Sequence, residues 1–115
     1  MFSPAGDHLA FVVGEPGHEH VGVDGVQVYP RAGETSILGE PAWSRDGGSL
    51  ALIEGGGRPQ LVVLVEFDNP NGDNTWPLPP QATDPSLHVF WAGRTNVVIG
   101  RELTKPVFAT SFTRE

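Results

Sequence analysis

Residues 43–53, WSRDGGSLALI, decide the fold that we expect of this chain. An aromatic residue leads into a Ser-x-Asp-Gly-Gly segment, and an apolar run follows. Serine and aspartate side chains accept hydrogen bonds from backbone N–H groups in tight turns, where glycine adopts a positive φ without strain. The string therefore predicts a hairpin, in which one strand ends on Trp43 and a second strand covers residues 50–53.

The same string occurs a second time near the start of the chain. Residues 2–12 read FSPAGDHLAFV and align with residues 43–53 at an offset of 41 (43 − 2). The aligned pairs are Phe2 with Trp43, Ser3 with Ser44, Gly6 with Gly47, Leu9 with Leu50, and Ala10 with Ala51. A third, degraded copy, FWAGRTNVVIG, spans residues 90–100 and keeps Phe90, Trp91 and the apolar strand. A period of about 40 residues is typical of one four-stranded propeller blade.

Strand patterns recur along the rest of the chain, and helical periodicity is missing almost everywhere. The 115 residues include 15 glycines and 11 prolines, which interrupt nearly every window long enough for a helix. We therefore predict an all-β chain of about nine or ten short strands. The predicted strands cover residues 8–14, 25–29, 35–38, 50–53, 61–67, 87–91, 96–99 and 107–112. Residues 50–53 and 61–67 are continuous apolar runs, as expected of strands that are buried on both faces.

The repeated string resembles the W-S-P-D-G-x-x-[LI]-A-F motif of TolB-type, WD-repeat-like β-propellers. Residues 2–11 and 43–52 follow this motif, and residues 90–99 follow it in degraded form. Arg45 replaces the usual proline, and Ala5 stands where aspartate is usual. The resemblance implies that the string has a structural role as the turn of each blade. The residues of this turn motif are Phe2, Ser3, Gly6, Trp43, Ser44, Asp46, Gly47, Phe90 and Trp91.

The chain is too short for a closed propeller ring. Propellers have about 4–8 blades, whereas 115 residues at 41 per blade (115/41) give about 2.8 four-stranded antiparallel blades. Residues 1–40 are expected to form a blade without its first strand, residues 41–83 a whole blade, and residues 84–115 a blade without its last strand. Three outcomes stay open: the chain is part of a longer protein, several copies assemble one ring, or the fold is a small β-sandwich or barrel.

Some side chains suggest ligands. His18 and His20 stand at i and i+2, so they share a face if they lie on a strand, and together they offer two imidazole ligands to a metal ion. We expect them in a loop between glycines and prolines instead, with no third ligand. Residues 68–74, DNPNGDN, offer oxygen ligands without the spacing of a calcium loop, and we expect a hairpin loop there. Trp76 and Tyr29 are candidates for stacking on a sugar or proline ring.

Composition excludes several classes of function. The net charge of −7 argues against nucleic acid and anionic membrane surfaces as partners. The absence of cysteine excludes disulfides, thiol catalysis and cysteine-bound zinc. The longest aliphatic run, residues 61–65, is far too short for membrane insertion. Ser44 with His8 or His88 lacks a G-x-S-x-G context, so we expect no enzyme activity, and no motif predicts a cofactor.

These exclusions, with the resemblance, favour a non-catalytic binding scaffold. TolB-type propellers commonly mediate protein–protein interaction in the bacterial cell envelope, so the resemblance implies a protein partner and a periplasmic or other extracytoplasmic place. One alternative is an oligomeric propeller lectin with Trp76, Trp91 or Tyr29 in its sugar pockets. Another is the accessory propeller of a prolyl-oligopeptidase-type serine peptidase. The end blades need cover, from a longer parent chain or from further copies, and we expect residues 2–13 and 107–112 to lie near that contact.

Overall fold

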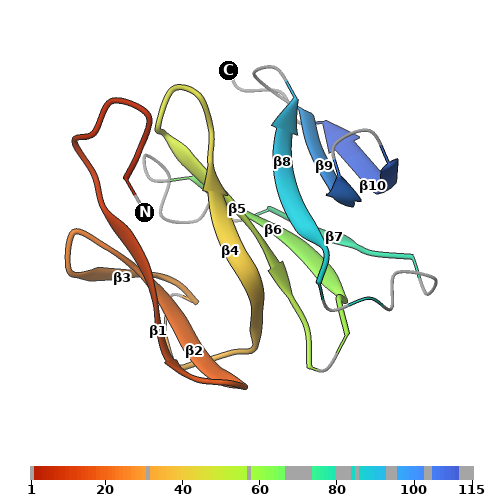
Figure 1. Cartoon of the computed structure of the whole chain (residues 1–115). Coiled ribbons are helices and arrows are strands. Elements are labelled where there is room, and N and C mark those ends of the chain that lie inside the picture. Colours follow the sequence, from red (N-terminus) through yellow and green to blue (C-terminus); the bar gives the residue numbers. More distant parts are fainter. Residues whose placement is uncertain are drawn as a thin grey trace.

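Strands alone make up the regular structure of the described residues in this computed structural model (Figure 1). The structure describes residues 2–30, 32–56, 58–66, 74–79, 84, 86–92, 96–102 and 105–111. Its strands are β1 (Ala10–Glu15), β2 (His18–Val23), β3 (Val26–Tyr29), β4 (Ile37–Trp43), β5 (Ser49–Glu54), β6 (Leu61–Glu66), β7 (Asn74–Pro77), β8 (His88–Ala92), β9 (Asn96–Glu102) and β10 (Lys105–Ser111). The all-β prediction is thereby confirmed.

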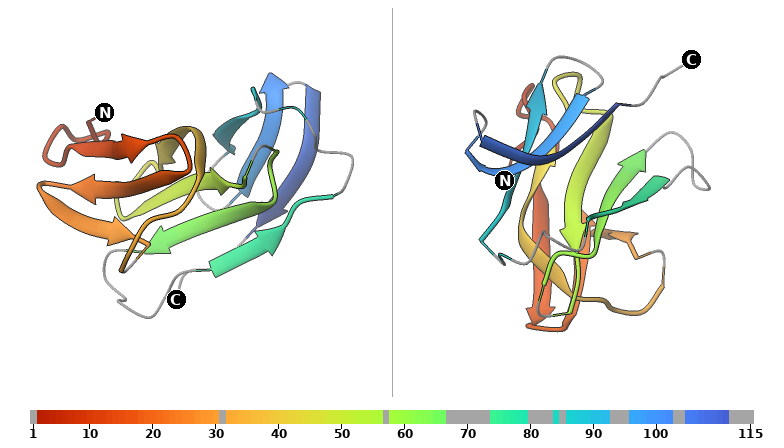
Figure 2. Two further views of the ribbon diagram at one scale, coloured as in Figure 1. Left: turned by 90° about the horizontal axis from the view of Figure 1, so that it is seen from below. Right: turned by 90° about the vertical axis from the view of Figure 1, so that its right-hand side faces the viewer.

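The strands form three antiparallel sheets in chain order. The first sheet contains β1–β2–β3, the middle sheet β4–β5–β6–β7, and the third sheet β8–β9–β10. Within each sheet every strand pairs with its neighbour in the chain, so each sheet is an up-and-down meander. Figures 1 and 2 show the three sheets side by side, with the middle sheet between the other two.

Two of the strands were not predicted. The expected loop at residues 14–20 contains the start of β2 instead, because a two-residue turn at Pro16–Gly17 pairs Glu15 with His18 directly. Proline and glycine suit the two central positions of such a turn. β7 pairs with β6 as the fourth strand of the middle sheet, and its Pro77 is tolerated because β7 lies at the sheet edge.

β4 is longer than the predicted strand at residues 35–38. It runs on to Trp43 through Gly39 and Pro41, two residues that usually end a strand. Its pairing with β5 is interrupted between Leu38 and Ala42, where the register shifts. A β-bulge at an edge strand accommodates both residues, because no ladder hydrogen bond is required of the proline nitrogen.

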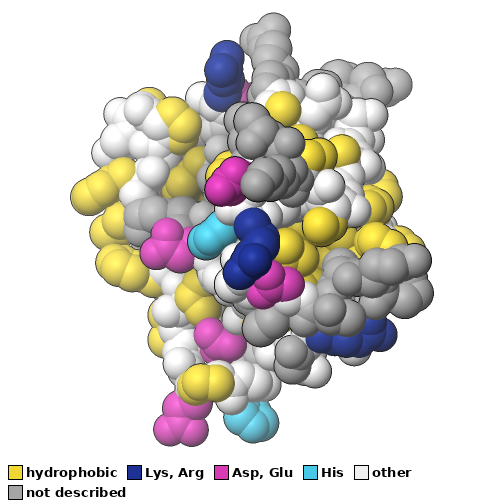
Figure 3. Space-filling view, turned by 45° about the vertical axis from the view of Figure 1, so that its right-hand side comes forward, with side chains coloured by type: hydrophobic (Ala, Val, Ile, Leu, Met, Phe, Trp, Pro, Cys, Tyr) yellow, Lys and Arg dark blue, Asp and Glu magenta, His cyan; other side chains and the backbone are white. Residues whose placement is uncertain are grey.

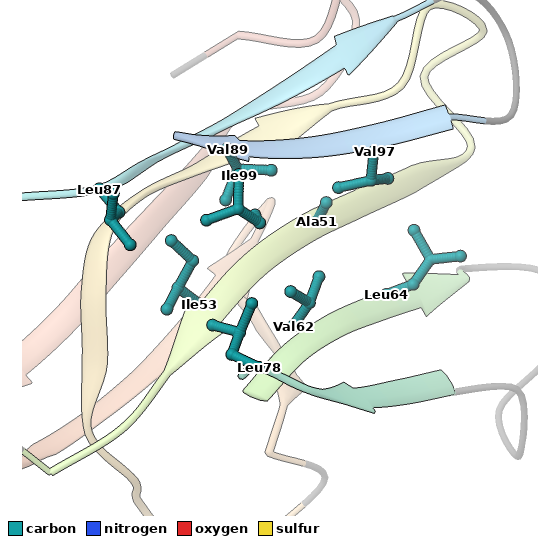
Figure 4. Packing of buried hydrophobic residues seen from close by; sticks show 9 residues of the cluster. All are labelled: Ala51, Ile53, Val62, Leu64, Leu78, Leu87, Val89, Val97 and Ile99. Carbon is teal, nitrogen blue, oxygen red and sulfur yellow. The ribbon is translucent and has the colours of Figure 1, made fainter. Parts of the chain in front are cut away.

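The middle sheet is buried on both faces, as its continuous apolar runs predict. Successive side chains of a strand point to opposite faces. One set of alternate residues packs against the first sheet: Leu50, Leu52, Val63 and Val65, which meet Ala10, Val21 and Val23. The other set packs against the third sheet: Ala51, Ile53, Val62 and Leu64, which meet Leu87, Val89, Val97 and Ile99 (Figure 4). Burial of each such leucine, isoleucine or valine contributes about 1.5–3 kcal/mol.

Polar contacts also join neighbouring sheets. The Glu54 carboxylate accepts hydrogen bonds from the Tyr29 hydroxyl, at 2.9 Å, and from the Thr35 hydroxyl. On the other side of the middle sheet, the Trp91 indole N–H donates to the Ala42 carbonyl at 2.9 Å. These bonds satisfy polar groups at the two sheet boundaries, and they fix the sheets against each other in one arrangement.

The described residues contain no helix long and apolar enough to cross a membrane.

Candidate functional site

The two good copies of the repeated string form the same turn. In the second copy the Ser44 N–H donates to the Ser49 carbonyl (2.9 Å), the Gly47 N–H to the Ser44 carbonyl (3.0 Å), and the Ser49 N–H to Ser44 Oγ (3.1 Å). In the first copy, 41 residues earlier, the Ser3 N–H donates to the His8 carbonyl (2.9 Å), the Gly6 N–H to the Ser3 carbonyl (2.9 Å), and the His8 N–H to Ser3 Oγ (3.2 Å). Trp43 pairs with Leu50 as Phe2 pairs with Leu9. The sequence repeat is thus a repeat of three hydrogen bonds and one strand pair.

The aspartate of the turn differs between the copies. Asp46 Oδ1 accepts a bond from the Ser44 hydroxyl at 2.7 Å and from the Gly48 N–H at 3.0 Å. Ala5 occupies the equivalent position in the first copy, and there the Ser3 hydroxyl donates to Asp7 Oδ1 at 2.8 Å instead. Gly6 (φ 76°) and Gly47 (φ 74°) adopt the same left-handed conformation, which favours glycine. Asp7 therefore replaces the motif aspartate from two positions further along the chain.

The third copy shares only part of this geometry. In the pairing of β8 with β9, Trp91 is the partner of Val97, as Trp43 is of Leu50. Phe90 is one position earlier and pairs with Val98. Trp91, rather than Phe90, is therefore the counterpart of Trp43. The turn itself, residues 93–95, lies outside the described residues.

The two described turns are neighbours in space. A side chain added at Gly47 would place its Cβ 3.7 Å from Ser3 Cβ. The His8 ring stacks on the Trp43 ring, with 6.2 Å between the ring centroids and an interplanar angle of 17°. The first and middle sheets therefore touch through equivalent segments of the repeat as well as through the apolar core.

His8 lies between two carboxylates. Its Nδ1 is 2.6 Å from Asp24 Oδ2, and its Nε2 is 3.9 Å from Asp7 Oδ2. Asp24 Oδ1 also accepts the Leu9 N–H at 2.9 Å, so the same carboxylate holds the start of β1. The hydrogen bond to Asp24 raises the pKa of His8, and Asp7 adds to this effect through its charge. The bond from His8 in turn lowers the pKa of Asp24.

The stability of the protein should decrease as the pH rises through the pKa of His8, which lies above its ordinary value of 6.5. A raised pKa in the folded state stabilises the fold below the unfolded pKa, and this stabilisation is lost above the folded pKa. Urea midpoints measured from about pH 6 to pH 8 should fall in the wild type and stay flatter in Asp24→Asn and His8→Gln. The lowered pKa of Asp24 acts in a separate, acidic range. Equal slopes in wild type and His8→Gln would contradict the assignment.

The serine hydroxyls of the turns are engaged in the turns themselves. Ser44 is 1% exposed and Ser3 is 4% exposed. Each hydroxyl donates to an aspartate and accepts a backbone N–H, as described above. His8, the ring nearest to them along the chain, bonds to Asp24. This arrangement suits a structural turn, in which the hydroxyl proton has a carboxylate partner.

The candidate sugar-binding rings pack inside the chain. Tyr29 is half-buried against the core between the first and middle sheets. Trp76 and Trp91 are half-buried against the core between the middle and third sheets. The Tyr29 hydroxyl and the Trp91 indole N–H are used in the sheet-joining bonds described above.

The candidate metal ligands are not gathered into a site. His18 and His20 lie on β2, not in a loop, at alternate positions opposite Glu15 and Val13 of β1. Among the described residues, no group of three or more His, Asp or Glu side chains could hold a metal ion. Of the proposed calcium segment, residues 68–73 lie outside the described residues, and Asn74 begins β7.

The outer faces of the two end sheets carry exposed apolar side chains. In the first sheet, Phe11 is 58% exposed and Val13 is 46% exposed, both on the face opposite to Ala10. In the third sheet, Val107 is 47% exposed. The surface in Figure 3 likewise has apolar side chains in several places beside charged ones. The outer face of the third sheet is hollowed, with a volume of about 550 Å³.

A second groove lies between β4 and β8, which are the first strands of the middle and third sheets. It has a volume of about 390 Å³ and is lined by Glu40, Pro41, Ala42, His88, Val89 and Phe90. Both strands are sheet edges, so their outward backbone groups border the groove.

Several of these groups were not predicted from the sequence. The hydrogen bond between His8 and Asp24 joins residues that are 16 positions apart. The only local signal is the Asp-Gly pair at residues 24–25, which indicates a hairpin turn but not a histidine partner. Phe11 has a clearer signal, because it aligns with the buried Leu52 at the offset of 41 residues (52 − 11). The two equivalent positions therefore differ in burial, since Phe11 is exposed and Leu52 is buried.

Comparisons with protein-family models, with characterised proteins and with solved structures give no match for this chain.

Proposed function

We propose that the chain is a run of three consecutive blades of a β-propeller, and that it serves as a non-catalytic scaffold that binds another protein. In this proposal the four-stranded middle sheet is a whole blade, and the first and third sheets, with three described strands each, belong to the two neighbouring blades. The repeated turn geometry and the four-stranded meander of the middle sheet support the assignment. The resemblance to TolB-type propellers favours the bacterial cell envelope as its place.

One observation carries the binding function. The middle sheet is buried on both faces, whereas the end sheets each have one covered face and one open face. Phe11 on the open face is 58% exposed, and its repeat equivalent Leu52 is 0% exposed. Neighbouring repeats cover each other's apolar faces, so a residue that is exposed in one copy and buried in another indicates a surface that a further protein can cover.

Sugar binding is less well supported than protein binding. The rings of Tyr29, Trp76 and Trp91 already pack against the cores within the chain. A stacking platform for a sugar requires an open ring face. The exposed apolar residues are instead Phe2, Phe11, Val13, Val26 and Val107.

A photo-crosslinking experiment tests this proposal. A benzoylphenylalanine at position 11 should form an adduct with a protein when cells of the source organism that produce the chain are irradiated. The matched control is position 26, because Val26 is 65% exposed on the same sheet but belongs to the opposite face, where it pairs with Val23. We expect adducts at position 11 and only background at position 26. The absence of an adduct at position 11, or equal labelling at both positions, would contradict the proposal.

A further inference from the structure

We infer that a second copy of this chain covers the open face of the first sheet, and that it does so with the outer face of its own third sheet. This inference rests on the proposed scaffold function and names its partner. The contact is head-to-tail, because the two faces that meet are different. The inference is argued from the two contacts inside the chain, between the first and middle sheets and between the middle and third sheets.

Both internal contacts use the same two kinds of face. Where the middle sheet meets the first, Leu50 and Leu52 pack toward Ala10. Where the third sheet meets the middle sheet, Val97 and Ile99 pack toward Ala51. These sets are equivalent in the repeat: Ala51 aligns with Ala10 at an offset of 41, and Val97 and Ile99 align with Leu50 and Leu52 at an offset of 47 (97 − 50). Each sheet thus packs one face on the preceding sheet and the opposite face on the following sheet. We call the face of Leu50, Leu52 and their repeat equivalents the leading face, and the face of Ala51 and its equivalents the trailing face.

The first sheet has its leading face open. Phe11, the equivalent of Leu52, lies on this face and is 58% exposed. Val13 follows it on the same face and is 46% exposed. The strand partners of these two residues are Gly22 and His20. The partner of Phe11 on β2 is thus a glycine, which offers no side chain to cover the ring.

The third sheet has its trailing face on the outside of the chain, opposite to Val97 and Ile99. Two rows of paired residues cross the three strands on this face. One row is Phe90, Val98 and Ala109, and the other is Ala92, Asn96 and Ser111. The hollow of about 550 Å³ lies over these rows and is lined by Ala92, Asn96, Val98, Ala109, Thr110 and Ser111.

The two open faces are the two halves of the contact that recurs inside the chain. The leading face of the first sheet carries the exposed Phe11, and the trailing face of the third sheet carries the hollow of about 550 Å³. The contact between them would continue the internal sequence of leading face on trailing face without a new kind of interface. A head-to-tail contact of this type closes into a ring if the rotation per copy permits, and extends otherwise.

Mixing of single-face variants tests this inference. Phe11→Asp damages only the first-sheet face, and Ala109→Asp damages only the third-sheet face, where Ala109 is exposed. Val26→Asp is the matched control, because it places the same charge on the first sheet away from the open face. Masses in solution are measured by sedimentation velocity and light scattering at micromolar concentrations, and circular dichroism verifies that each variant keeps its β structure.

We expect the wild type and Val26→Asp to associate, and each of Phe11→Asp and Ala109→Asp alone to be a monomer. An equimolar mixture of the two monomeric variants should regain a complex of two chains, because one undamaged face of each kind remains. A monomeric wild type, an associating Ala109→Asp, or a mixture that stays monomeric would overturn the inference. If position 11 then still crosslinks to a different protein, the scaffold proposal stands without self-association. If it crosslinks to nothing, both fail.

Discussion

Replacing Leu52 with alanine should lower the free energy of unfolding by about 2–5 kcal/mol, whereas Phe11→Ala should change it by about 0.5 kcal/mol or less. The two residues occupy equivalent positions of the repeat, but Leu52 is 0% exposed between two sheets and Phe11 is 58% exposed. Truncation of Leu52 removes apolar contacts and leaves a cavity that the neighbouring Val63 and Val21 cannot fill without backbone movement. The difference between the two losses in free energy of unfolding therefore measures how much burial stabilises this position of the repeat.

Urea denaturation is the measurement for this pair. Both substitutions are made in the Ala109→Asp background, because self-association would add a concentration-dependent stabilisation to the wild type. Equal losses of stability for Leu52→Ala and Phe11→Ala would mean that the first sheet does not pack on the middle sheet in solution. A larger loss for Phe11→Ala than for Leu52→Ala would mean that the outer face of the first sheet is covered from within the chain.

The parts of the fold that were predictable are those in which local sequence and burial agree. The runs at residues 50–53 and 61–67 are apolar at every position, and they form β5 and β6, which are buried on both faces. The turn at residues 44–48 was predictable because serine, aspartate and glycine each satisfy a specific requirement of its backbone. In both cases a single segment contains all of the necessary information.

The parts that were not predictable depend on segments far away in the chain. β2 begins with His18, Glu19 and His20, and these polar residues form a strand because all three pair with β1, while Glu19 also pairs with Thr35 on its other side. β4 passes through Gly39 and Pro41 because a register shift against β5 accommodates them. Local propensity opposes both strands, and tertiary pairing outweighs it.

The candidate site likewise has features that depend on one local segment and features that depend on distant segments. The turn residues Ser44 and Asp46 are close in sequence, and the hydrogen bonds that they accept from turn N–H groups were predictable from the local pattern. The Glu54 carboxylate, in contrast, joins Tyr29 and Thr35 across two sheets, and no local pattern identifies it. That the end sheets need cover was predicted from the number of repeats, but the exposure of the single residues was not, because Phe11 and Leu52 are both ordinary core residues by sequence.

Trp43→Ala should lower the free energy of unfolding by about 3 kcal/mol, at the lower end of the range for loss of a large aromatic side chain, because Trp43 is half-buried. Its ring packs against the core between the first and middle sheets and stacks on His8. The matched control is Phe2→Ala, which removes the equivalent aromatic residue of the first copy. Phe2 is 67% exposed, so its loss should change stability by about 0.5 kcal/mol or less.

Trp43 also connects the turn of the middle sheet to the N-terminal turn beside the first sheet, so its loss has a second expected effect. Without the indole ring, the His8 ring keeps its bond to Asp24 but loses its stacking partner. Amide hydrogen exchange at His8 and Leu9 should therefore become faster in Trp43→Ala, while exchange in β5 and β6 should change only by the global loss of stability. If Trp43→Ala were as stable as the wild type, with exchange at His8 and Leu9 unchanged, the aromatic position of the repeated string would have no structural role, and the repeat would lose its strongest physical justification.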